Sequence, residues 1–335
     1  MLTEAILLIL SLITYTLIYF YKDKISNKFK LIDIPDAKRK IHSIPTPILG
    51  GFIVLVILVY NFSAYHFLNQ TNDTLIIFIL ILIFFIIGII DDINQLSSIF
   101  RLTFLFTVTY IFLNFSENLI INELNFNYKN LNIKLNSYSI FITTLCVLLV
   151  VNAINLADGI NGLSTMLIFC WAIYIKFFLF KDFSMSGFSF LFLIVLIFYH
   201  IYKGKYFMGD AGVTMCAILI GLASIYVYNI QNNNSETIYV EELFLLFFIP
   251  GLDMFRLFVF RILNKKNPFS ADNQHLHHLL INKFKISYCL FFYFLISFLP
   301  LTIYKTFEVN TLYLISIYSV ILLVLINYNL KNISN

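Results

Sequence analysis

The chain has 335 residues, of which 60% are apolar, 18% aromatic and only 12% charged. Because a soluble domain usually carries about a quarter charged residues, this composition excludes an ordinary soluble protein. The net charge of +4 reflects how basic residues are distributed among the loops, and it does not indicate nucleic-acid binding.

Apolar stretches long enough to cross about 30 Å of hydrocarbon recur along the whole chain. They predict an all-α polytopic membrane protein, a bundle of about eleven transmembrane helices. Because no separate soluble domain is indicated, residues 1–335 are expected to form a single integral-membrane domain. The predicted spans are 3–21, 48–68, 75–90, 100–115, 139–155, 163–180, 187–201, 212–229, 243–262, 286–304 and 311–328.

Basic residues gather at alternate ends of these spans, and the opposite ends carry mostly acidic residues. Lys22, Lys24 and Lys28 follow the first span and no basic segment precedes it, so this span is expected to remain as an anchor. The positive-inside rule makes the basic ends cytoplasmic. The amino terminus is therefore expected outside the membrane and the carboxy terminus in the cytoplasm.

The long loop on the predicted outer side, residues 116–138, alternates apolar and polar residues on both sides of Lys129-Asn130. Period-2 patterning about a two-residue turn predicts a small external β-hairpin that covers the outer end of the bundle. An irregular solvated loop is the alternative. The cytoplasmic loops hold the Gly, Pro, His and Asp clusters, so function is expected there.

The first cytoplasmic loop, residues 33–51, combines prolines, glycines and a basic run. Its prolines give it a fixed shape, and Lys40 and His42 suit the binding of phosphate. An attraction of the lysines to anionic lipid would explain the basic charge of this loop, but it would not explain its prolines and glycines.

Carboxylates mark two further cytoplasmic positions. Asp91 and Asp92 end the third predicted span, where unpartnered carboxylates are costly. Such hard oxygen donors suit Mg²⁺ and a phosphate-bearing substrate, although a solvated helix end is the alternative. Asp210, just before the eighth span, is a third acidic candidate on this side. A lone Asp at that position could instead cap the helix.

Polar residues at a spacing of three close the fifth predicted span. Asn152, Asn155 and Asp158 lie near one helical face, where amides can read the hydrogen-bonding edges of a polar ligand. Asn161 belongs to the same motif, whose two glycines permit close approach of a backbone. Helix capping followed by a turn would explain the glycines but not three aligned polar residues.

The last cytoplasmic loop contains three histidines within four residues, His275, His277 and His278. No Cys or Glu lies nearby to complete a zinc site, so binding of phosphate by imidazole donors is preferred to zinc. Asp253 and Arg256, spaced i, i+3 in the ninth span, are expected to form a structural ion pair inside the bundle.

In this order and on one side of the membrane, the motifs resemble the polyprenyl-phosphate N-acetylhexosamine-1-phosphate transferase family (glycosyltransferase family 4), relatives of phospho-N-acetylmuramoyl-pentapeptide transferase. Two positions depart from the family pattern, because Asn161 stands where many members have a second Asp and Val213 where many have Ser. The similarity covers residues 33–280 and rests on five motifs, Asp33 to Gly51, Asp91-Asp92, Asn152 to Gly162, Phe207 to Gly212 and His275 to His278.

The resemblance implies transfer of a HexNAc-1-phosphate, first of all GlcNAc-1-phosphate, from a UDP-sugar to polyprenyl (undecaprenyl) phosphate with release of UMP. It implies Mg²⁺, with Mn²⁺ as a substitute, and the cytoplasmic face of a bacterial inner membrane. Asp91, Asp92 and Asp210 take the catalytic and metal-holding roles, with a general-base role for one of the first two left open. Substrate binding falls to Lys40, His42, Asn152, Asn155, Asp158, Asn161, His275, His277 and His278.

The His-Leu-His-His form is similar to the branch that primes O-antigen (lipopolysaccharide), enterobacterial common antigen or teichoic acid synthesis in cell-wall biogenesis. Phospho-N-acetylmuramoyl-pentapeptide transferase is the alternative within the family. A secondary transporter would place its polar residues near the bilayer midplane, whereas here they cluster at span ends. An intramembrane aspartyl protease would need a glycine where Phe207 stands. Homodimer formation is left open.

Overall fold

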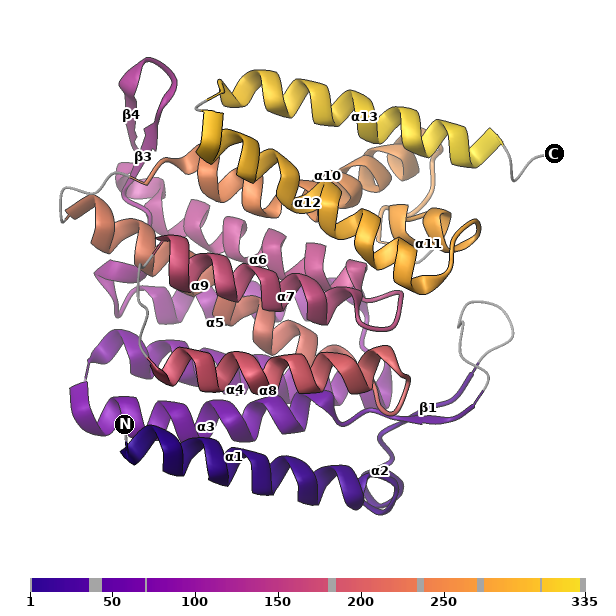
Figure 1. Ribbon diagram of the computed structural model, residues 1–335. Helices are drawn as coiled ribbons and strands as arrows, with labels where there is room; N and C mark the ends of the chain where they lie inside the picture. Colours follow the sequence, from indigo (N-terminus) through magenta and orange to yellow (C-terminus); the bar gives the residue numbers. More distant parts are fainter. Residues whose placement is uncertain are drawn as a thin grey trace.

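A computed structural model of the chain describes residues 2–35, 44–69, 71–179, 185–233, 238–269, 274–307 and 309–331. Its long helices run side by side, with the connections gathered at two ends (Figure 1). The helices are α1 Leu2–Phe20, α2 Lys22–Phe29, α3 Gly50–Asn69, α4 Asn72–Asn94, α5 Ser98–Leu113, α6 Ser139–Ala157, α7 Leu163–Tyr174, α8 Met185–Tyr202, α9 Gly209–Asn233, α10 Val240–Leu263, α11 Leu276–Ile281, α12 Ile286–Phe307 and α13 Thr311–Lys331.

Long apolar helices are the expected solution for a chain in lipid, because each backbone polar group must find its partner within the helix. Five of the described helices, α4, α6, α9, α10 and α12, are long and apolar enough to span a membrane, and α1 with α2, bent by 70°, is a sixth candidate. The all-α membrane fold is therefore confirmed. The other apolar helices are fully described only over shorter stretches, such as Gly50–Ser63 and Thr311–Ile326, so these lengths do not establish the predicted count of eleven spans.

One end of the bundle carries a pair of strands, β3 (Glu123–Phe126) and β4 (Leu131–Lys134), which project beyond the helices (Figure 1). They are antiparallel, with Phe126 opposite Leu131, so four residues join them. The two-residue turn predicted at Lys129-Asn130 is wrong. The connection is longer because Tyr128–Asn130 forms a 3-10 turn, and the Tyr128 N–H donates to Glu241 of α10 at 3.3 Å. We call this end the hairpin end.

The opposite end collects the four carboxylates Asp91, Asp92, Asp158 and Asp210, and we call it the carboxylate end. There β1 (Ile32–Asp33) pairs with β2 (Thr46–Pro47) in antiparallel register. Phe207 extends this small sheet, because its N–H donates to the Pro47 carbonyl at 2.8 Å and its carbonyl accepts from Gly50, also at 2.8 Å. The described part of the first loop is thereby tied to the segment that leads into α9.

Helix α9 lies at the centre of the bundle, packed against α3, α4, α6 and α7. In the most apolar stretch of α9, 83% of the residues are buried inside the protein, compared with 33–44% in the corresponding stretches of the other four spans. Helices in lipid gain little from the hydrophobic effect, so their association depends on close packing of small residues. A Cβ added at Gly51 of α3 or Gly88 of α4 would lie closer than 3.0 Å to the α9 backbone at Gly212 or Ala211. These glycines let three helices meet at the first turn of α9.

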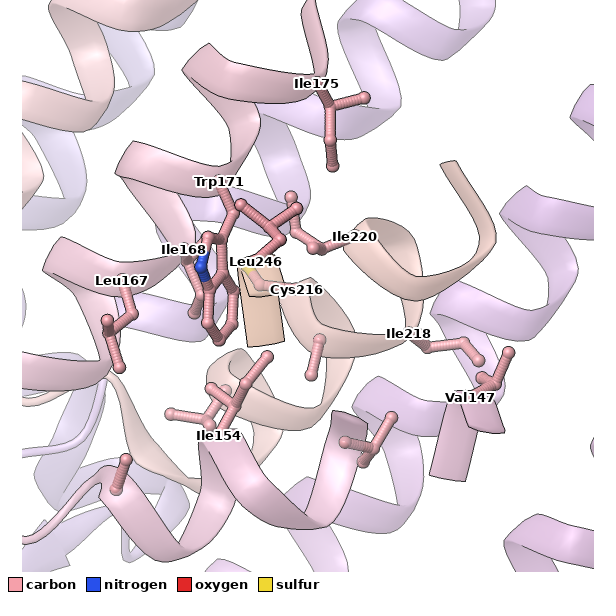
Figure 2. Close-up of a cluster of buried hydrophobic side chains, with 14 of the residues drawn as sticks. Val147, Ile154, Leu167, Ile168, Trp171, Ile175, Cys216, Ile218, Ile220 and Leu246 are labelled. Atoms are coloured by element: carbon pink, nitrogen blue, oxygen red, sulfur yellow. The ribbon is translucent and has the colours of Figure 1, made fainter. Parts of the chain in front are cut away.

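A buried apolar cluster holds α6, α7, α9 and α10 together. Figure 2 shows Trp171 of α7 among Ile154 of α6, Cys216 of α9 and Leu246 of α10. The Trp171 ring also packs edge-on against Phe247, with ring centroids 4.9 Å apart. Because interiors packed in this way resist displacement, the segment between α6 and α7 is held in place. That segment contains residues 158–162 of the polar motif.

Candidate functional site

Asp91 and Asp210 come from different helices, and Arg101 of α5 lies between them. Nη1 of Arg101 contacts Oδ2 of Asp91 and lies 4.0 Å from Oδ2 of Asp210. The Leu96 N–H donates to Oδ1 of Asp91 at 2.7 Å. Only a short loop separates α4 from α5, so the chain turns back and returns Arg101 to the end of α4. The buried Asp91 carboxylate thus has the charged partner that its position requires.

Asp92 caps helix α9 across the interface between α4 and α9. Its Oδ1 accepts the N–H of Asp210 at 2.9 Å, and its Oδ2 accepts the N–H of Ala211 at 3.1 Å. These are N–H groups of the first helical turn, which have no partner within a helix and attract negative charge. Gly209 precedes them with a φ of 74°, in the left-handed region that favours glycine. Asp92 is therefore the cap of α9, and the Asp210 side chain remains available to the site.

Asn155 joins the polar motif of α6 to the carboxylates. Its Nδ2 donates to Oδ1 of Asp210 at 2.8 Å. The other members of the motif point elsewhere: Asn152 lines a groove between α5 and α6, and Asn161 lies beside Gly204 in the loop before α9. Asn155 therefore contacts the carboxylates, whereas Asn152 faces a different neighbouring helix.

Asp158 follows the last residue of α6, and the Oγ of Ser164 donates to its Oδ1. The carboxyl group is recessed among protein atoms although solvent reaches it. Burial, together with the nearby negative charge of Asp210 and Asp33, raises the pKa of Asp158 to about 7. Asp158 therefore lies within electrostatic reach of Asp210.

The three histidines lie beside the glycines of the polar motif. His277 is buried, and neither of its ring nitrogens has a hydrogen-bond partner among the described residues. A Cβ added at Gly159 would lie closer than 3.0 Å to Nε2 of both His277 and His278. Burial and the two neighbouring imidazoles hold the pKa of His277 well below its usual range, so the ring is neutral at pH 7. A neutral imidazole can both donate and accept one hydrogen bond.

The predicted pair of Asp253 and Arg256 is confirmed, with Nη2 of Arg256 2.7 Å from Oδ1 of Asp253. The same carboxylate also accepts from Nδ1 of His275 at 3.0 Å. This second contact joins α10 to residues 274–278, which we call the histidine segment. The contact was not predicted from the sequence. Lys40 and His42, two predicted phosphate ligands, lie outside the described residues.

Arg101 is a site residue that was not predicted from the sequence. The sequence does indicate this contact. Arg101 follows Asp91 by ten positions, and the loop between the two helices is too short to separate them. Charges at the ends of apolar helices are functional by default, and an adjacent opposite charge is the first partner to consider.

The side chains of the site can be compared with the ligands that Mg²⁺ requires. No three Asp, Glu, His or Cys side chains in the described ranges are grouped closely enough to enclose a metal ion. Mg²⁺, however, is usually held by one or two carboxylates together with substrate phosphates and water. Asp210 suits that role, because its Oδ2 is 4.0 Å from Arg101 and thus beyond hydrogen-bonding distance. The residues fit Mg²⁺ shared with a substrate, and they do not form a protein-only cage.

An apolar groove with a volume of about 390 Å³ runs between α5 and α6. At one end it is lined by Leu102, which follows Arg101 in the chain, and Thr103 on one side and by Asn152 on the other. Phe106, Leu145, Leu148 and Leu149 continue it away from the carboxylate end. The groove is thus an apolar depression on the surface of the two helices, with Asn152 among its lining residues.

Part of the chain matches a known protein family. Residues 74–228 match the family model for glycosyl transferase family 4. The undecaprenyl-phosphate alpha-N-acetylglucosaminyl 1-phosphate transferase of Escherichia coli O157:H7 is 28% identical over 277 residues, 79% of this chain and 73% of the relative. The Salmonella typhi protein of the same name is 26% identical, over 82% of this chain and 75% of the relative.

A third relative, the decaprenyl-phosphate N-acetylglucosaminephosphotransferase of Mycobacterium leprae, is 27% identical over 43% of this chain and 41% of its own length. The range matched by the family model contains all four carboxylates of the site together with Arg101 and Asn155. Over residues 74–228, a little less than half of its length, the chain is therefore similar to glycosyl transferase family 4.

Proposed function

We propose that this protein transfers a HexNAc-1-phosphate, in the first instance GlcNAc-1-phosphate, from a UDP-sugar to polyprenyl phosphate and releases UMP. The observation that supports this most directly is the joining of Asp91 and Asp210, from two helices, through Arg101 at one end of a membrane bundle. The relatives' names describe the transfer of N-acetylglucosaminyl 1-phosphate with undecaprenyl phosphate, or of the corresponding group with decaprenyl phosphate.

The proposed step is a substitution at phosphorus. An oxygen of the lipid phosphate forms a bond to the β-phosphorus of the UDP-sugar, and the bond from that phosphorus to the bridging oxygen breaks. The bridging oxygen leaves with UMP, and the product is a lipid diphosphate that carries the sugar. A phosphate monoester has a second pKa of about 6, so the acceptor is largely dianionic at neutral pH and needs no strong base.

The protein's contribution to such a transfer is mainly positioning and electrostatic stabilisation. Arg101 places a fixed positive charge between Asp91 and Asp210, where a phosphate oxygen can approach it. Asp91 and Asp92 are already engaged by N–H donors, which favours positioning over proton removal for both. Asn155 orients Asp210, the carboxylate best placed to hold Mg²⁺.

Mg²⁺, when bound with the substrate, would neutralise negative charge on the diphosphate. Asp158 and Asn161 would contact the nucleotide sugar, and Asn152 would lie where the donor site meets the apolar groove. The histidine segment would hold phosphate: His277 and His278 reach the site beside Gly159, and His275 supports them. Lys40 and His42 are assigned to phosphate as well, on sequence alone.

The apolar groove between α5 and α6 supports a lipid acceptor. A polyprenyl tail is insoluble in water, so its phosphate can reach a membrane enzyme only at the bilayer surface. Leu102, the residue after Arg101, lines one end of the groove. A lipid bound there would have its phosphate end toward the carboxylates. We assign the carboxylate end to the cytoplasmic face of a bacterial inner membrane, with the amino terminus outside, because the basic residues gather there.

The test is an assay of the purified full-length protein in detergent with polyprenyl phosphate, Mg²⁺ and a panel of UDP-N-acetylhexosamines. We expect lipid-linked sugar and UMP in equal amounts with UDP-N-acetylglucosamine, and loss of both on chelation of the metal. If no donor in the panel yields UMP and lipid product, the proposal is wrong. Product only with the UDP-muramoyl pentapeptide would assign the chain to peptidoglycan synthesis instead.

The metal assignment has its own matched pair of variants. Asp210→Asn should lower turnover by at least about 100-fold and raise the Mg²⁺ concentration needed for half-maximal activity, since a carboxylate ligand becomes a neutral amide. Asp73→Asn changes a carboxylate at the hairpin end, where Asp73 accepts from Asn118 at 2.7 Å, and should leave the Mg²⁺ dependence unchanged. Normal turnover in Asp210→Asn would contradict the assignment.

A further inference from the structure

Asp253 forms a hydrogen-bonded clamp between α10 and the segment that precedes α11. Its Oδ1 accepts Nε of Arg256 at 3.2 Å and Nη2 at 2.7 Å. Its Oδ2 accepts Nδ1 of His275 at 3.0 Å and the N–H of Leu276 at 3.1 Å. Arg256 also donates to the Gln274 carbonyl at 2.7 Å. Each oxygen of this buried carboxylate therefore has two donors, and two of the four come from the histidine segment.

Asp253 does more than neutralise the charge of Arg256. Arg256 alone, one turn further along α10, would neutralise the charge of Asp253 in the membrane. The contacts to His275 and Leu276 cross from α10 to a segment that returns after a loop, so they fix the position of that segment. They also fix which His275 nitrogen carries a proton, because Nδ1 must donate to the carboxylate.

Contacts lead from His275 to the carboxylate site. The His275 and His277 rings are stacked, with centroids 5.5 Å apart, and the His277 and His278 rings are 4.3 Å apart. His277 lies against Gly159, the residue that follows Asp158. A shift of His275 would therefore displace the two histidines that face the polar motif.

We propose that Asp253 is a positioning residue of the transfer reaction: it holds His275 and the start of α11 so that His277 and His278 face Gly159 in the donor site. This inference rests on the proposed function, because the donor site is defined by it. Asp253 touches no reacting atom. Its effect reaches the donor only through the histidine segment.

The kinetic test is a double-mutant cycle of Asp253→Asn and His275→Ala. The amide keeps the shape of the side chain but loses its charge, and the loss of hydrogen bonds to a charged group should raise the donor KM about tenfold. The KM for polyprenyl phosphate should stay within about twofold. If Asp253 acts through His275, the double variant should be no worse than the more impaired single variant. If the increase in the donor KM of the double variant equals the product of the two single-variant increases, the proposal is wrong.

Two further variants keep the test decisive if Asp253→Asn folds poorly. His275→Asn places an amide N–H near the position of Nδ1, whereas His275→Gln places it near Nε2. The Asn variant should retain the lower donor KM of the two, and the reverse order would contradict the clamp. Glu242→Gln is the matched control, a buried carboxylate in the first turn of the same helix, 2.7 Å from Lys305. It should lower stability without changing the donor KM.

Limited trypsin digestion separates the clamp from the proposed function. Lys265 and Lys266 lie in the loop that the clamp closes, and both are exposed. Asp253→Asn should be cut there about tenfold faster than the wild type, because weaker hydrogen bonds raise the population of the open loop. Glu242→Gln should be cut at the wild-type rate. An inactive wild type would refute the proposed function, whereas equal cleavage of all three proteins would refute the clamp.

Discussion

Asn155 and Asp210 join α6 to α9 through one hydrogen bond, from Nδ2 to Oδ1 across 2.8 Å. The bond fixes the direction of the carboxylate that we assign to Mg²⁺. Asn155→Leu removes the donor at nearly constant volume. Since a hydrogen bond to a charged group contributes about 1.5–3 kcal/mol, kcat/KM for UMP release should fall about 10- to 100-fold.

The same substitution should leave stability almost unchanged, because hydrogen bonds between membrane helices contribute only about 0.6 kcal/mol on average. Thermal unfolding in detergent measures this. A large drop in the unfolding temperature together with reduced activity would make Asn155 a packing residue. Wild-type kcat/KM in Asn155→Leu would show that the contact with Asp210 has no part in the reaction.

Arg101 should matter for both stability and activity. Arg101→Met leaves Asp91, a buried carboxylate, with the Leu96 N–H as its one remaining hydrogen-bond donor among the described residues. Removing one partner of a buried ion pair costs about 3–5 kcal/mol, so the unfolding temperature should drop clearly and activity should be lost. Arg101→Lys keeps the charge but not the planar guanidinium, and should show an intermediate loss.

Lys22→Met provides the matched control for Arg101→Met. Lys22 pairs with Asp23 at 3.0 Å, but the Asp23 side chain is 72% exposed. An exposed pair contributes about 0–1 kcal/mol, so this variant should unfold within a few degrees of the wild type. Similar losses in the two variants would mean that the Asp91 pair is no more important than a surface pair.

The predicted helices agree with the structure where apolar runs are long and bounded by polar residues. The predicted spans 139–155 and 243–262 lie within α6 and α10. The first span was predicted as a simple anchor, yet the chain bends by 70° after Phe20 and continues as α2. Hydrophobicity indicates that a helix crosses lipid. It does not show where a polar continuation stays helical along the surface, because that depends on local packing.

The carboxylates and amides of the candidate site were predicted from the sequence, whereas Arg101 and most of the contacts were not. Spacing grouped Asn152 with Asn155, but a three-residue step turns the helix by less than a full turn, and the neighbouring helices decide which side chain meets which partner. Asn152 faces α5, whereas Asn155 faces α9. The capping of α9 by Asp92 was also invisible in the sequence, because the two segments are far apart in the chain.

The raised pKa of Asp158 predicts a specific pH dependence of stability. An unfolded Asp titrates at about 3.9, whereas the folded carboxyl titrates at about 7, so the folded state binds the proton more tightly. The stability gained from this proton is complete below the unfolded value and is lost as the pH rises through the folded one. The unfolding temperature of Asp158→Asn, relative to the wild type, should therefore increase from pH 4 to pH 7 and level off above pH 8. A difference that does not vary with pH would show that Asp158 titrates normally.

Gly159 should be irreplaceable for a steric reason that differs from that of other glycines in the chain. A Cβ at this position would meet the Nε2 atoms of His277 and His278, and the His277 ring is buried. Gly159→Ala should displace the histidine segment and raise the donor KM at least about tenfold. Overpacking of this kind costs about 1–3 kcal/mol, so the protein should still fold.

Gly251 of α10 is the matched control, because a Cβ added there would meet nothing within 4 Å. Since alanine is favoured over glycine inside a helix by about 1 kcal/mol, Gly251→Ala should be as stable as the wild type or slightly more so, with a donor KM within about twofold. Gly88→Ala is the opposite extreme, since its Cβ would meet the Ala211 backbone, which cannot rotate away. It should lower the unfolding temperature of the whole bundle. A donor KM that responds equally to Gly159→Ala and Gly251→Ala would contradict the contact between the histidines and the polar motif.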